Sequence, residues 1–268
     1  MSQLARDFEG RLALVTGSAT GLGRSMAVKL AQRGADVIVN YTRSAAEAEE
    51  CADLCRDAGA RVWVVQADVS DPEACRALIA PAQAQGALDI LINNAGITRH
   101  AMDHSDLDAL SPDDFLDIYR VNVVGAYLMV QAAKPLLQAT HARSGRAGVV
   151  LNTSSIAGVV GIGSSVAYAA SKGALNTMTL SLARALGPAI RVNAICPGFI
   201  GTRWFRDRMS AEAFEHTQAS IRGRTVLGVA SGPDDVADAA LFFVSDAARH
   251  ITGETLMVDA GMHLGLPG

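Results

Sequence analysis

Tyr168 and Lys172 are the two residues whose types and spacing most directly suggest chemistry. They are four residues apart, so in a helix both side chains would lie on the same face. A phenol has a pKa of about 10, and a neighbouring cation favours its ionised form, so such a pair can exchange a proton with a bound molecule. The spacing alone also fits an ordinary surface pair on a helix.

A glycine-rich segment, TGSATGLG at 16–23, joins a short apolar run to a helical pattern. Gly17 permits a tight turn, Gly21 permits backbone to approach a pyrophosphate, and Gly23 permits close packing of the helix on the sheet. The following helix presents free N–H groups and its positive dipole end to phosphate. A dinucleotide site is favoured over a plain glycine turn. Its expected binding residues are Gly17, Ser18, Thr20, Gly21, Leu22 and Gly23.

Two further segments follow later apolar runs and are expected at the same place. Asp68 and Val69 follow the third run, and Asn94, Ala95 and Gly96 follow the fourth. In a doubly wound sheet, ligands bind outside the carboxyl ends of the strands. An Asp there can accept a hydrogen bond from an adenine amino group, and small residues leave room for a ribose. Turn chemistry explains each segment separately, but explains all three less well.

The end of the second apolar run bears on the choice between NAD and NADP. NAD sites commonly carry an acidic residue there. In this chain the run ends in Val39-Asn40-Tyr41-Thr42-Arg43-Ser44, and the first carboxylate after it is Glu47. Arg43 can instead pair with a 2′-phosphate, and Tyr41 lies beside it in the sequence. The pattern favours NADP(H). NAD(H) use stays possible, because Thr20 stands where a second basic residue would have strengthened the prediction.

These residues can meet only if the fold brings distant segments together. Short apolar runs alternate with longer amphipathic stretches, and several runs are apolar on both faces, as in parallel sheets covered by helices. The expected strands are 11–16, 36–40, 61–66, 88–93, 148–153, 190–195 and 254–259. Helical patterns begin near Leu22, Ala45, Asp71, Ser111, Ser165 and Pro233. This predicts an α/β, doubly wound, Rossmann-like domain with a mostly parallel seven-stranded sheet and helices on both faces.

No linker or repeat divides the chain, so 1–268 is expected to form a single domain. The alternation of strand and helix patterns breaks only at about 199–232. The residues are 50% hydrophobic and 19% charged, which fits a globular protein. A formal charge of -4 gives no sign of a nucleic-acid surface. The absence of a long apolar run and of a signal-peptide core favours a cytoplasmic protein without a membrane span.

No metal site is predicted. Cys51 and Cys55 have helical spacing but no matching pair of ligands follows them, which favours free thiols. His100 and His104 share that spacing in a polar loop, without the intervening Glu of a zinc helix.

Taken in order, these segments resemble the short-chain dehydrogenase/reductase superfamily in its ordinary, shorter branch. The resemblance covers nearly the whole chain. It rests on TGSATGLG, Asp68-Val69, NNAG, Asn122, Ser155, YAASK and Pro197-Gly198. NNAGITR and VNYTRS are most similar to the 3-oxoacyl-(acyl-carrier-protein) reductases, with sugar and steroid dehydrogenases as further relatives. One departure is Ala260-Gly261, where the family often has two glycines.

The resemblance implies roles for named residues. Tyr168 would exchange a proton with the substrate oxygen while hydride passes to or from the nicotinamide. Lys172 and the positive ring of the oxidised nicotinamide would lower the pKa of Tyr168, and Lys172 would also hold the ribose. Ser155, thirteen residues before Tyr168, would hydrogen-bond the same oxygen, whereas Ser154 would point oppositely. Asn122 would fix a water that relays protons to Lys172. Its alternative role is an Asn bonded to backbone inside a helix. The residues expected beside the nicotinamide are Pro197, Gly198, Ile200 and Thr202.

The region 199–232 would then be a substrate lid, with Trp204 and Phe205 as its apolar element. Its arginines could recognise an anionic or carrier-linked substrate, or could form a solvated or subunit-facing surface. They are Arg203, Arg206, Arg208, Arg222 and Arg224. The resemblance also implies a homotetramer, with the helix after Ser111 and the segment 253–265 as interface parts.

The favoured function is an NAD(P)(H)-dependent oxidoreductase that interconverts a carbonyl and a secondary alcohol, most similar to 3-oxoacyl-thioester reductases. Sugar, steroid and other alcohol dehydrogenases are alternatives. Two other classes are a dinucleotide sensor without turnover and an extended-branch epimerase or dehydratase. Tyr168, Lys172 and Ser155 are all present, which favours an enzyme over a sensor, and no large substrate domain follows Gly198.

Overall fold

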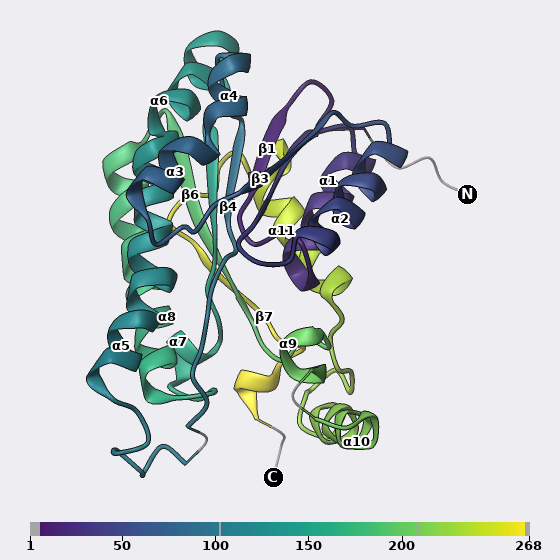
Figure 1. The fold of residues 1–268 in the computed structure, drawn as a ribbon, viewed down its shortest axis with the longest axis vertical. Coiled ribbons are helices and arrows are strands. Elements are labelled where there is room, and N and C mark those ends of the chain that lie inside the picture. Colours follow the sequence, from purple (N-terminus) through teal and green to yellow (C-terminus); the bar gives the residue numbers. More distant parts are fainter. Residues whose placement is uncertain (1–5, 102, 208, 266–268) are drawn as a thin grey trace.

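Seven parallel strands form one sheet, in the order β3-β2-β1-β4-β5-β6-β7, in the computed structural model (Figure 1). The structure describes residues 6–101, 103–207 and 209–265. The strands are β1 Leu12–Val15, β2 Asp36–Tyr41, β3 Val62–Gln66, β4 Ile90–Asn93, β5 Gly148–Thr153, β6 Ile190–Pro197 and β7 Thr255–Val258. This confirms the predicted doubly wound sheet, and every predicted strand overlaps an observed one.

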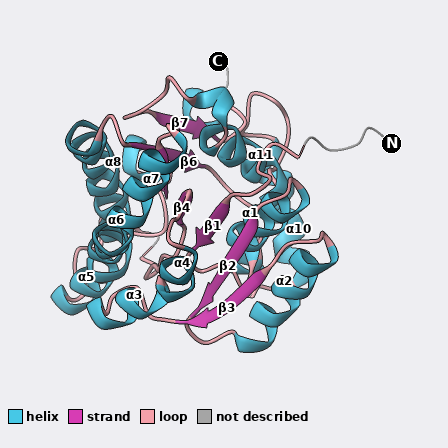
Figure 2. Ribbon diagram, turned by 90° about the horizontal axis from the view of Figure 1, so that it is seen from above, coloured by secondary structure: helices cyan, strands magenta, loops and turns pink. Residues whose placement is uncertain are grey.

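Helices cover both faces of this sheet (Figure 2). One face carries α1 Gly21–Gln32, α2 Ala45–Asp57 and α11 Pro233–Val244. The other carries α3 Pro72–Leu78, α4 Ala80–Gln85, α5 Pro112–Tyr119, α6 Ala126–Ser144 and α8 Val166–Leu186. Other elements of the described chain are α7 Ala157–Val160, α9 Arg203–Arg206, α10 Ala211–Arg222, and the 3-10 turns η2 Asp246–Ala248 and η3 Met262–Leu264.

The central strands are apolar on both faces because each face meets a separate core. In β1, Ala13 and Val15 belong to the core under α1 and α11, whereas Leu12 and Leu14 belong to the core under α6 and α8. All four are buried. Full burial of a Val or Leu side chain contributes about 1.5–3 kcal/mol. Such strands hold the sheet rigid and so fix the loops that leave its carboxyl ends.

Side-chain caps explain why several helices start where the sequence predicts. Asp71 accepts a hydrogen bond from the Glu73 amide at the start of α3. Ser111 forms a reciprocal capping box with Asp114 at the start of α5. Ser165 accepts a hydrogen bond from the Tyr168 amide, at 3.2 Å, and so fixes the first turn of α8. Each cap satisfies an amide that has no partner within the helix.

The helix expected after Ser111 is interrupted. Between α5 and α6 lies a π-helical turn, η1 Arg120–Gly125. Sequence periodicity did not indicate this turn, nor the short helices α4, α7 and α9, nor the longer helix α10. Within the described ranges, no helix combines the length and apolarity that crossing a membrane requires.

The end of β7 has an unusual backbone. Ala260 has φ +55°, the one positive φ of a non-glycine residue in the described chain. Its carbonyl accepts a hydrogen bond from the Leu227 amide at 3.1 Å. A Cβ added to Gly261 would lie 2.8 Å from Cβ of Val226. The segment after β7 is therefore packed tightly on residues of the region 199–232, and within it Ala260 adopts the left-handed backbone where the family often has glycine.

Candidate active site

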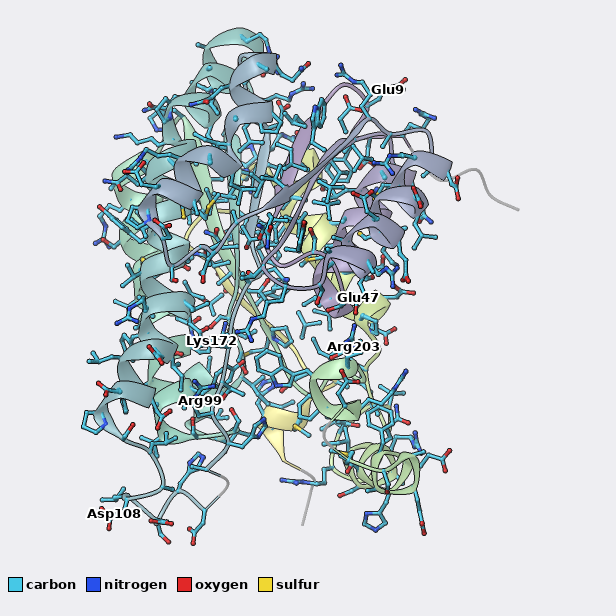
Figure 3. All side chains as sticks on the ribbon, viewed as in Figure 1. Glu9, Glu47, Arg99, Asp108, Lys172 and Arg203 are labelled. Atoms are coloured by element: carbon cyan, nitrogen blue, oxygen red, sulfur yellow. The ribbon has the colours of Figure 1, made fainter. Side chains whose placement is uncertain are left out.

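Four loops meet at the carboxyl edge of the sheet. They follow β1, β4, β5 and β6, which are neighbours in the strand order and run parallel. The edge therefore collects Gly17, Gly96, Ser155 and Gly198 from distant parts of the sequence. The helix α8 adds Tyr168 and Lys172 to the same place, and Figure 3 shows the position of Lys172.

Tyr168 and Lys172 share a face of α8, as their spacing predicts. The ammonium nitrogen of Lys172 lies 5.7 Å from the centroid of the Tyr168 ring. Lys172 is buried, and its Nζ donates a hydrogen bond to the carbonyl oxygen of Thr153 at 2.7 Å. An ammonium has three donors, so two remain for other partners. The pair is thus held inside the protein rather than on a solvated helix surface.

Burial shifts the pKa values of both groups. Desolvation raises the pKa of Tyr168 to about 12, while a hydrogen bond to Ser155 acts in the opposite direction. Desolvation lowers the pKa of Lys172 to about 8. Burial is the largest influence on the pKa of Tyr168 here, and the lowering expected from Lys172 together with an oxidised nicotinamide ring stays a prediction for the nucleotide-bound site. At neutral pH Tyr168 is therefore a protonated phenol, suited to donate a proton.

Ser155 and Ser154 point in different directions, as expected for successive residues after a strand. The Ser155 hydroxyl oxygen accepts a hydrogen bond from the Ala157 amide at 3.1 Å and also interacts with Tyr168. The Ser154 hydroxyl donates to the carbonyl oxygen of Lys172 at 3.1 Å and is buried. Ser155 is thus beside the phenol, whereas Ser154 fastens α8 to the end of β5.

Asn122 lies in the π-helical turn η1, beside Lys172. A Cβ added to Gly96 would lie 3.2 Å from Oδ1 of Asn122 and 3.6 Å from Nζ of Lys172. The amide of Asn122 bonds both backbone groups of Ile97, at 2.8 and 3.0 Å, and donates to Oγ of Ser171 at 3.1 Å. Its side chain is therefore satisfied by protein groups, which matches the alternative of an Asn bonded to backbone.

The glycine loop fits a bound dinucleotide, because side chains could not be added to it. A Cβ on Gly17 would lie 3.0 Å from Cα of Ala95, and Gly21 has φ +58°. A Cβ on Gly23 would lie 2.5 Å from both Nδ2 of Asn94 and the carbonyl oxygen of Gly17. Gly23 thus makes room for the loop after β4 as well as for the helix. The result is bare backbone at the N-terminus of α1, which suits a pyrophosphate.

Polar side chains hold this loop in shape. Ser18 is fully buried; its hydroxyl donates to the Val15 carbonyl at 2.8 Å and accepts from the Asn40 amide at 3.0 Å. Asn40 Oδ1 accepts from the Gly17 amide at 3.0 Å. Asn94 Nδ2 donates to the carbonyl oxygens of Thr16 and Gly17, at 3.0 and 3.1 Å. Thr16 and Asn40 were not among the predicted site residues, although an Asn inside an apolar strand was a signal for Asn40.

The side of the edge near β2 and β3 holds the residues predicted for the adenosine half. Arg43 is exposed and forms no ion pair with any described residue. Tyr41 is half-buried at the end of β2. Oδ1 of Asp68 accepts hydrogen bonds from the amide and hydroxyl of Ser70, at 2.9 and 2.8 Å. Val69 is buried and contacts Gly125 of η1, so it shapes the wall rather than offering a polar group.

The remaining predicted residues line the start of the glycine loop and the segment after β6. Thr20 is the N-cap residue of α1, and Leu22 is buried in its first turn. Pro197 ends β6 and is buried; Gly198 is tight, since an added Cβ would lie 2.7 Å from Cβ of Asp259. Ile200 packs on the core under α1. Thr202, in the segment after β6, lies against the glycine loop, since a Cβ added to Gly21 would lie 3.6 Å from Cβ of Thr202.

The predicted lid contributes a cluster of aromatic side chains. The rings of Phe199 and Phe205 lie 4.7 Å apart between centroids, and those of Phe199 and Phe214 lie 6.3 Å apart. The Trp204 ring lies 6.4 Å from the Tyr168 ring. Trp204 is thus the lid side chain that contacts the phenol.

The predicted lid arginines have different environments. Arg203 pairs with Glu47 and Asp207, and the guanidinium of Arg206 lies over the Phe214 ring, 5.3 Å from its centroid. Arg222 and Arg224 are exposed. Arg208 lies outside the described residues.

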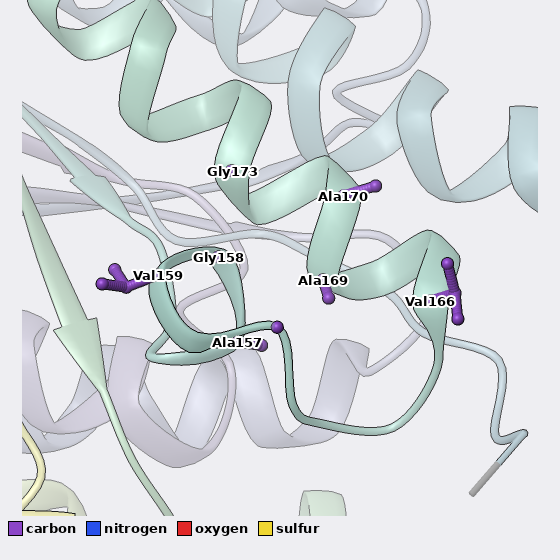
Figure 4. Close-up of a pocket in the computed structure, with 8 residues that line it drawn as sticks. Ala157, Gly158, Val159, Val166, Ala169, Ala170 and Gly173 are labelled. Carbon is purple, nitrogen blue, oxygen red and sulfur yellow. The ribbon is translucent and has the colours of Figure 1, made fainter. Parts of the chain in front are cut away.

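A hollow of about 380 Å³ lies between α7 and α8 (Figure 4). Small and apolar residues line it, including Ala157, Gly158, Ala169 and Gly173. Neither Tyr168 nor Lys172 lines it, so it is separate from the candidate active site. Cys51 and Cys55, which raised the question of a metal, are both buried in α2. Among the described residues no cluster of three or more His, Cys, Asp or Glu side chains is arranged to hold a metal.

Comparisons with known proteins add a family context. A family model described as "Enoyl-(Acyl carrier protein) reductase" matches residues 17–263. The putative ketoacyl reductase 2 of the granaticin polyketide synthase from Streptomyces violaceoruber is 42% identical over 257 residues, which cover 96% of this chain and 97% of that protein. An L-rhamnose 1-dehydrogenase (NAD(P)(+)) from Sphingomonas sp. (strain SKA58) is 36% identical over 261 residues, which cover 96% of this chain and 98% of that protein. The crystal structure of a short chain dehydrogenase from Burkholderia cenocepacia J2315 in complex with NADP superimposes with a TM-score of 0.84 at 36% identity, covering 96% of this chain and 99% of that chain.

Proposed function

The chain belongs to the short-chain dehydrogenase/reductase family, and from this membership we propose that it reduces a 3-oxoacyl thioester with NADPH. It is an oxidoreductase that uses a nicotinamide dinucleotide and acts on a small-molecule substrate. The observation that carries the proposed chemistry is the half-buried phenol of Tyr168, which bonds Ser155 and lies beside the Lys172 ammonium, and whose raised pKa keeps it protonated at neutral pH, as a proton donor must be. The similarity to a ketoacyl reductase supports the substrate class.

We propose that Tyr168 donates its phenolic proton to the substrate carbonyl oxygen. Ser155, which already bonds Tyr168, would donate a hydrogen bond to the same oxygen as its negative charge develops. The bound nicotinamide supplies the hydride that reduces the carbonyl carbon. Lys172 would hold the ribose with its remaining donors, and its positive charge would stabilise the phenolate that Tyr168 becomes after it donates its proton. Asn122 would position Ile97 and Ser171 around Lys172, and the water relay implied by the family is part of this proposal.

The residues proposed to hold the dinucleotide are those of the glycine loop, the adenosine side and the nicotinamide side. They are Gly17, Ser18, Thr20, Gly21, Leu22, Gly23, Tyr41, Arg43, Asp68, Val69, Asn94, Ala95, Gly96, Tyr168, Lys172, Pro197, Gly198, Ile200 and Thr202. The contacts of Ser18 and Asn94 indicate that these two act by shaping backbone that faces the phosphates.

The substrate proposal is tested by steady-state kinetics that follow NADPH or NADP at saturating concentration. We expect kcat/KM for acetoacetyl thioesters to exceed that for free sugars, including L-rhamnose, by about a hundredfold or more, since sites discriminate strongly through differential transition-state binding. The relative that oxidises L-rhamnose makes a sugar dehydrogenase the second candidate. Faster oxidation of a sugar than reduction of any 3-oxoacyl thioester would establish that candidate instead.

The preference for NADP is proposed to rest on Arg43, an exposed guanidinium without an ion-pair partner among the described side chains. Replacing Arg43 with Ala should weaken NADPH binding about tenfold or more and leave NADH binding unchanged, because a charge-assisted bond to the 2′-phosphate is lost. Titration calorimetry with both nucleotides measures this difference. The control is Arg146→Ala, which removes an exposed arginine from the turn between α6 and β5. Equal weakening of NADH and NADPH in Arg43→Ala would contradict the assignment.

Three further features belong to the proposal. Residues 1–268 are proposed to form one domain, with about 199–232 as its lid. The protein is proposed to be a cytoplasmic homotetramer. Exposed apolar side chains on α5, α7 and α8 support an assembly, among them Leu116, Val159 and Val166. Carrier linkage of the substrate is also proposed.

A further inference from the structure

Three consecutive residues at the start of α9 contact three different parts of the proposed site. Thr202 packs against Gly21 of the glycine loop, since a Cβ added there would lie 3.6 Å from Cβ of Thr202. Nη1 of Arg203 lies 2.7 Å from Oε1 of Glu47 in α2. Trp204 has its ring 6.4 Å from that of Tyr168, measured between centroids. One turn of helix therefore contacts the phosphate loop, the helix after β2 and the proposed proton donor.

The Glu47–Arg203 ion pair joins the two sides of the sheet edge. Glu47 lies in α2, which follows β2, and Arg203 lies in α9, which follows β6. In the sheet, β1, β4 and β5 separate these two strands, and neighbouring strands are about 4.8 Å apart. The loops that reach each other thus start about 19 Å apart. Figure 3 shows Glu47 and Arg203 facing each other across this edge.

Several charges surround this pair. Arg203 also pairs with Asp207 within its own turn, at 3.0 Å. The hydrogen bond from Arg203 holds the pKa of Glu47 below its ordinary value, so Glu47 is ionised at neutral pH. The charge of Arg24 in α1 also lowers the pKa of Glu47, although the ion pair of Arg24 is with Glu50, at 2.8 Å. Among these contacts, Glu47–Arg203 is the one that connects α9 to the far side of the edge.

We propose that the Glu47–Arg203 pair positions α9 over the glycine loop, so that it slows release of the dinucleotide and holds Trp204 against Tyr168. Both are positioning residues, which act through Thr202 and Trp204. The inference rests on the proposed dinucleotide site. It adds to that site a contact that no local sequence pattern reveals, between residues 156 positions apart.

Breaking the Glu47–Arg203 pair is expected to change the rate of NADPH dissociation by a small factor that depends on ionic strength. Glu47 and Arg203 are 30% and 48% exposed, and pairs with such exposure change equilibria by up to about fivefold. Exposed pairs are also screened by salt. We therefore expect Glu47→Gln to speed NADPH dissociation about three- to fivefold at low ionic strength, and the difference to vanish near 1 M salt.

A double-mutant cycle measures the pair. Glu47→Gln, Arg203→Gln and the double variant are compared by stopped-flow displacement of NADPH. The Trp63→Phe background leaves Trp204 as the chain's one remaining tryptophan, so its fluorescence reports on its packing against Tyr168. Each single variant and the double variant should release NADPH at the same raised rate, since either substitution removes the whole interaction. The control is Asp53→Asn, which removes a charge from α2 that pairs with Arg56 instead.

The outcomes separate this inference from the function on which it rests. An unchanged release rate in Glu47→Gln would overturn the inference alone, as would additive effects in the double variant or an effect that persists at high salt. Tighter NADPH binding in Glu47→Gln would also overturn it, because it would show that Arg203 serves the phosphates directly. If the unaltered protein did not bind NADPH or NADH, the proposed function would fall, and this inference with it.

Discussion

Replacing Tyr168 with Phe should lower kcat/KM for carbonyl reduction by about a thousandfold, with NADPH affinity within about twofold of the original. The substitution removes the phenolic proton that Tyr168 is proposed to donate. It keeps the ring, so the contact with Trp204 and the packing on Lys172 persist. Steady-state kinetics with NADPH and the best substrate, together with nucleotide titration, measure both quantities.

Tyr127→Phe is a matched control for this prediction, since Tyr127 lies in α6 and is 47% exposed. It should leave kcat/KM unchanged. Activity in Tyr168→Phe close to that of the original protein would rule out Tyr168 as the proton donor. Loss of NADPH binding together with activity would instead indicate that the hydroxyl, and not only its proton transfer, is needed to hold the nucleotide site together.

Replacing Lys172 with Met should have two opposite effects: kcat falls about a hundredfold or more, and the free energy of unfolding rises. Burial lowers the pKa of Lys172 from 10.5 to about 8. A shift of this size corresponds to about 3 kcal/mol of destabilisation at neutral pH. The lost hydrogen bond to Thr153 offsets about 1 kcal/mol of the gain. The variant should therefore be about 2 kcal/mol more stable at pH 7.

The pH dependence of this gain follows from the direction of the shift. Below about pH 8 Lys172 is charged in both the folded and unfolded states, so the burial cost is present in full. Between about pH 8 and 10.5 only the unfolded state keeps the proton, and the stability of the native protein rises with pH. Above that range both states are neutral, and the advantage of Lys172→Met should disappear.

Chemical denaturation at pH 7 and near pH 10.5, without added nucleotide, measures this difference. Lys134→Met is the control, since Lys134 is exposed on α6. A Lys172→Met protein that is less stable than the original at pH 7 would contradict the prediction. So would a stability gain of the same size at both pH values.

The sheet and the helix starts could be predicted because their signals are local. A strand such as β1 is apolar at every position, since Leu14 and Val15 face different cores. Ser111 and Ser165 begin helices because their side chains cap amides three residues ahead. The spacing of Tyr168 and Lys172 belongs to the same class of signal, since one turn of helix decides it.

Other features depend on contacts that no local pattern contains. Ser18 was expected at the dinucleotide, but its hydroxyl is used between β1 and β2, because a buried hydroxyl needs partners. The raised pKa of Tyr168 depends on how deeply the surrounding loops bury it. The reach of Arg203 to Glu47 depends on the path of a whole connection after β6. These are properties of the assembled edge rather than of any segment.

The π-helical turn η1 has a consequence for how the chain between Pro112 and Ser144 can change in length. A π turn holds one residue more than an α turn, and one residue rotates a helix by about 100°. The phase of α5 is thereby shifted against that of α6, which lets α5 pack on α8 while α6 packs on α3 and the sheet. Gly125 marks the tightest point, since a Cβ there would lie 2.9 Å from Cγ2 of Val69. Deleting one residue from 120–125 would restore a regular helix and bring both halves into one phase, so that only one of them could keep its buried face.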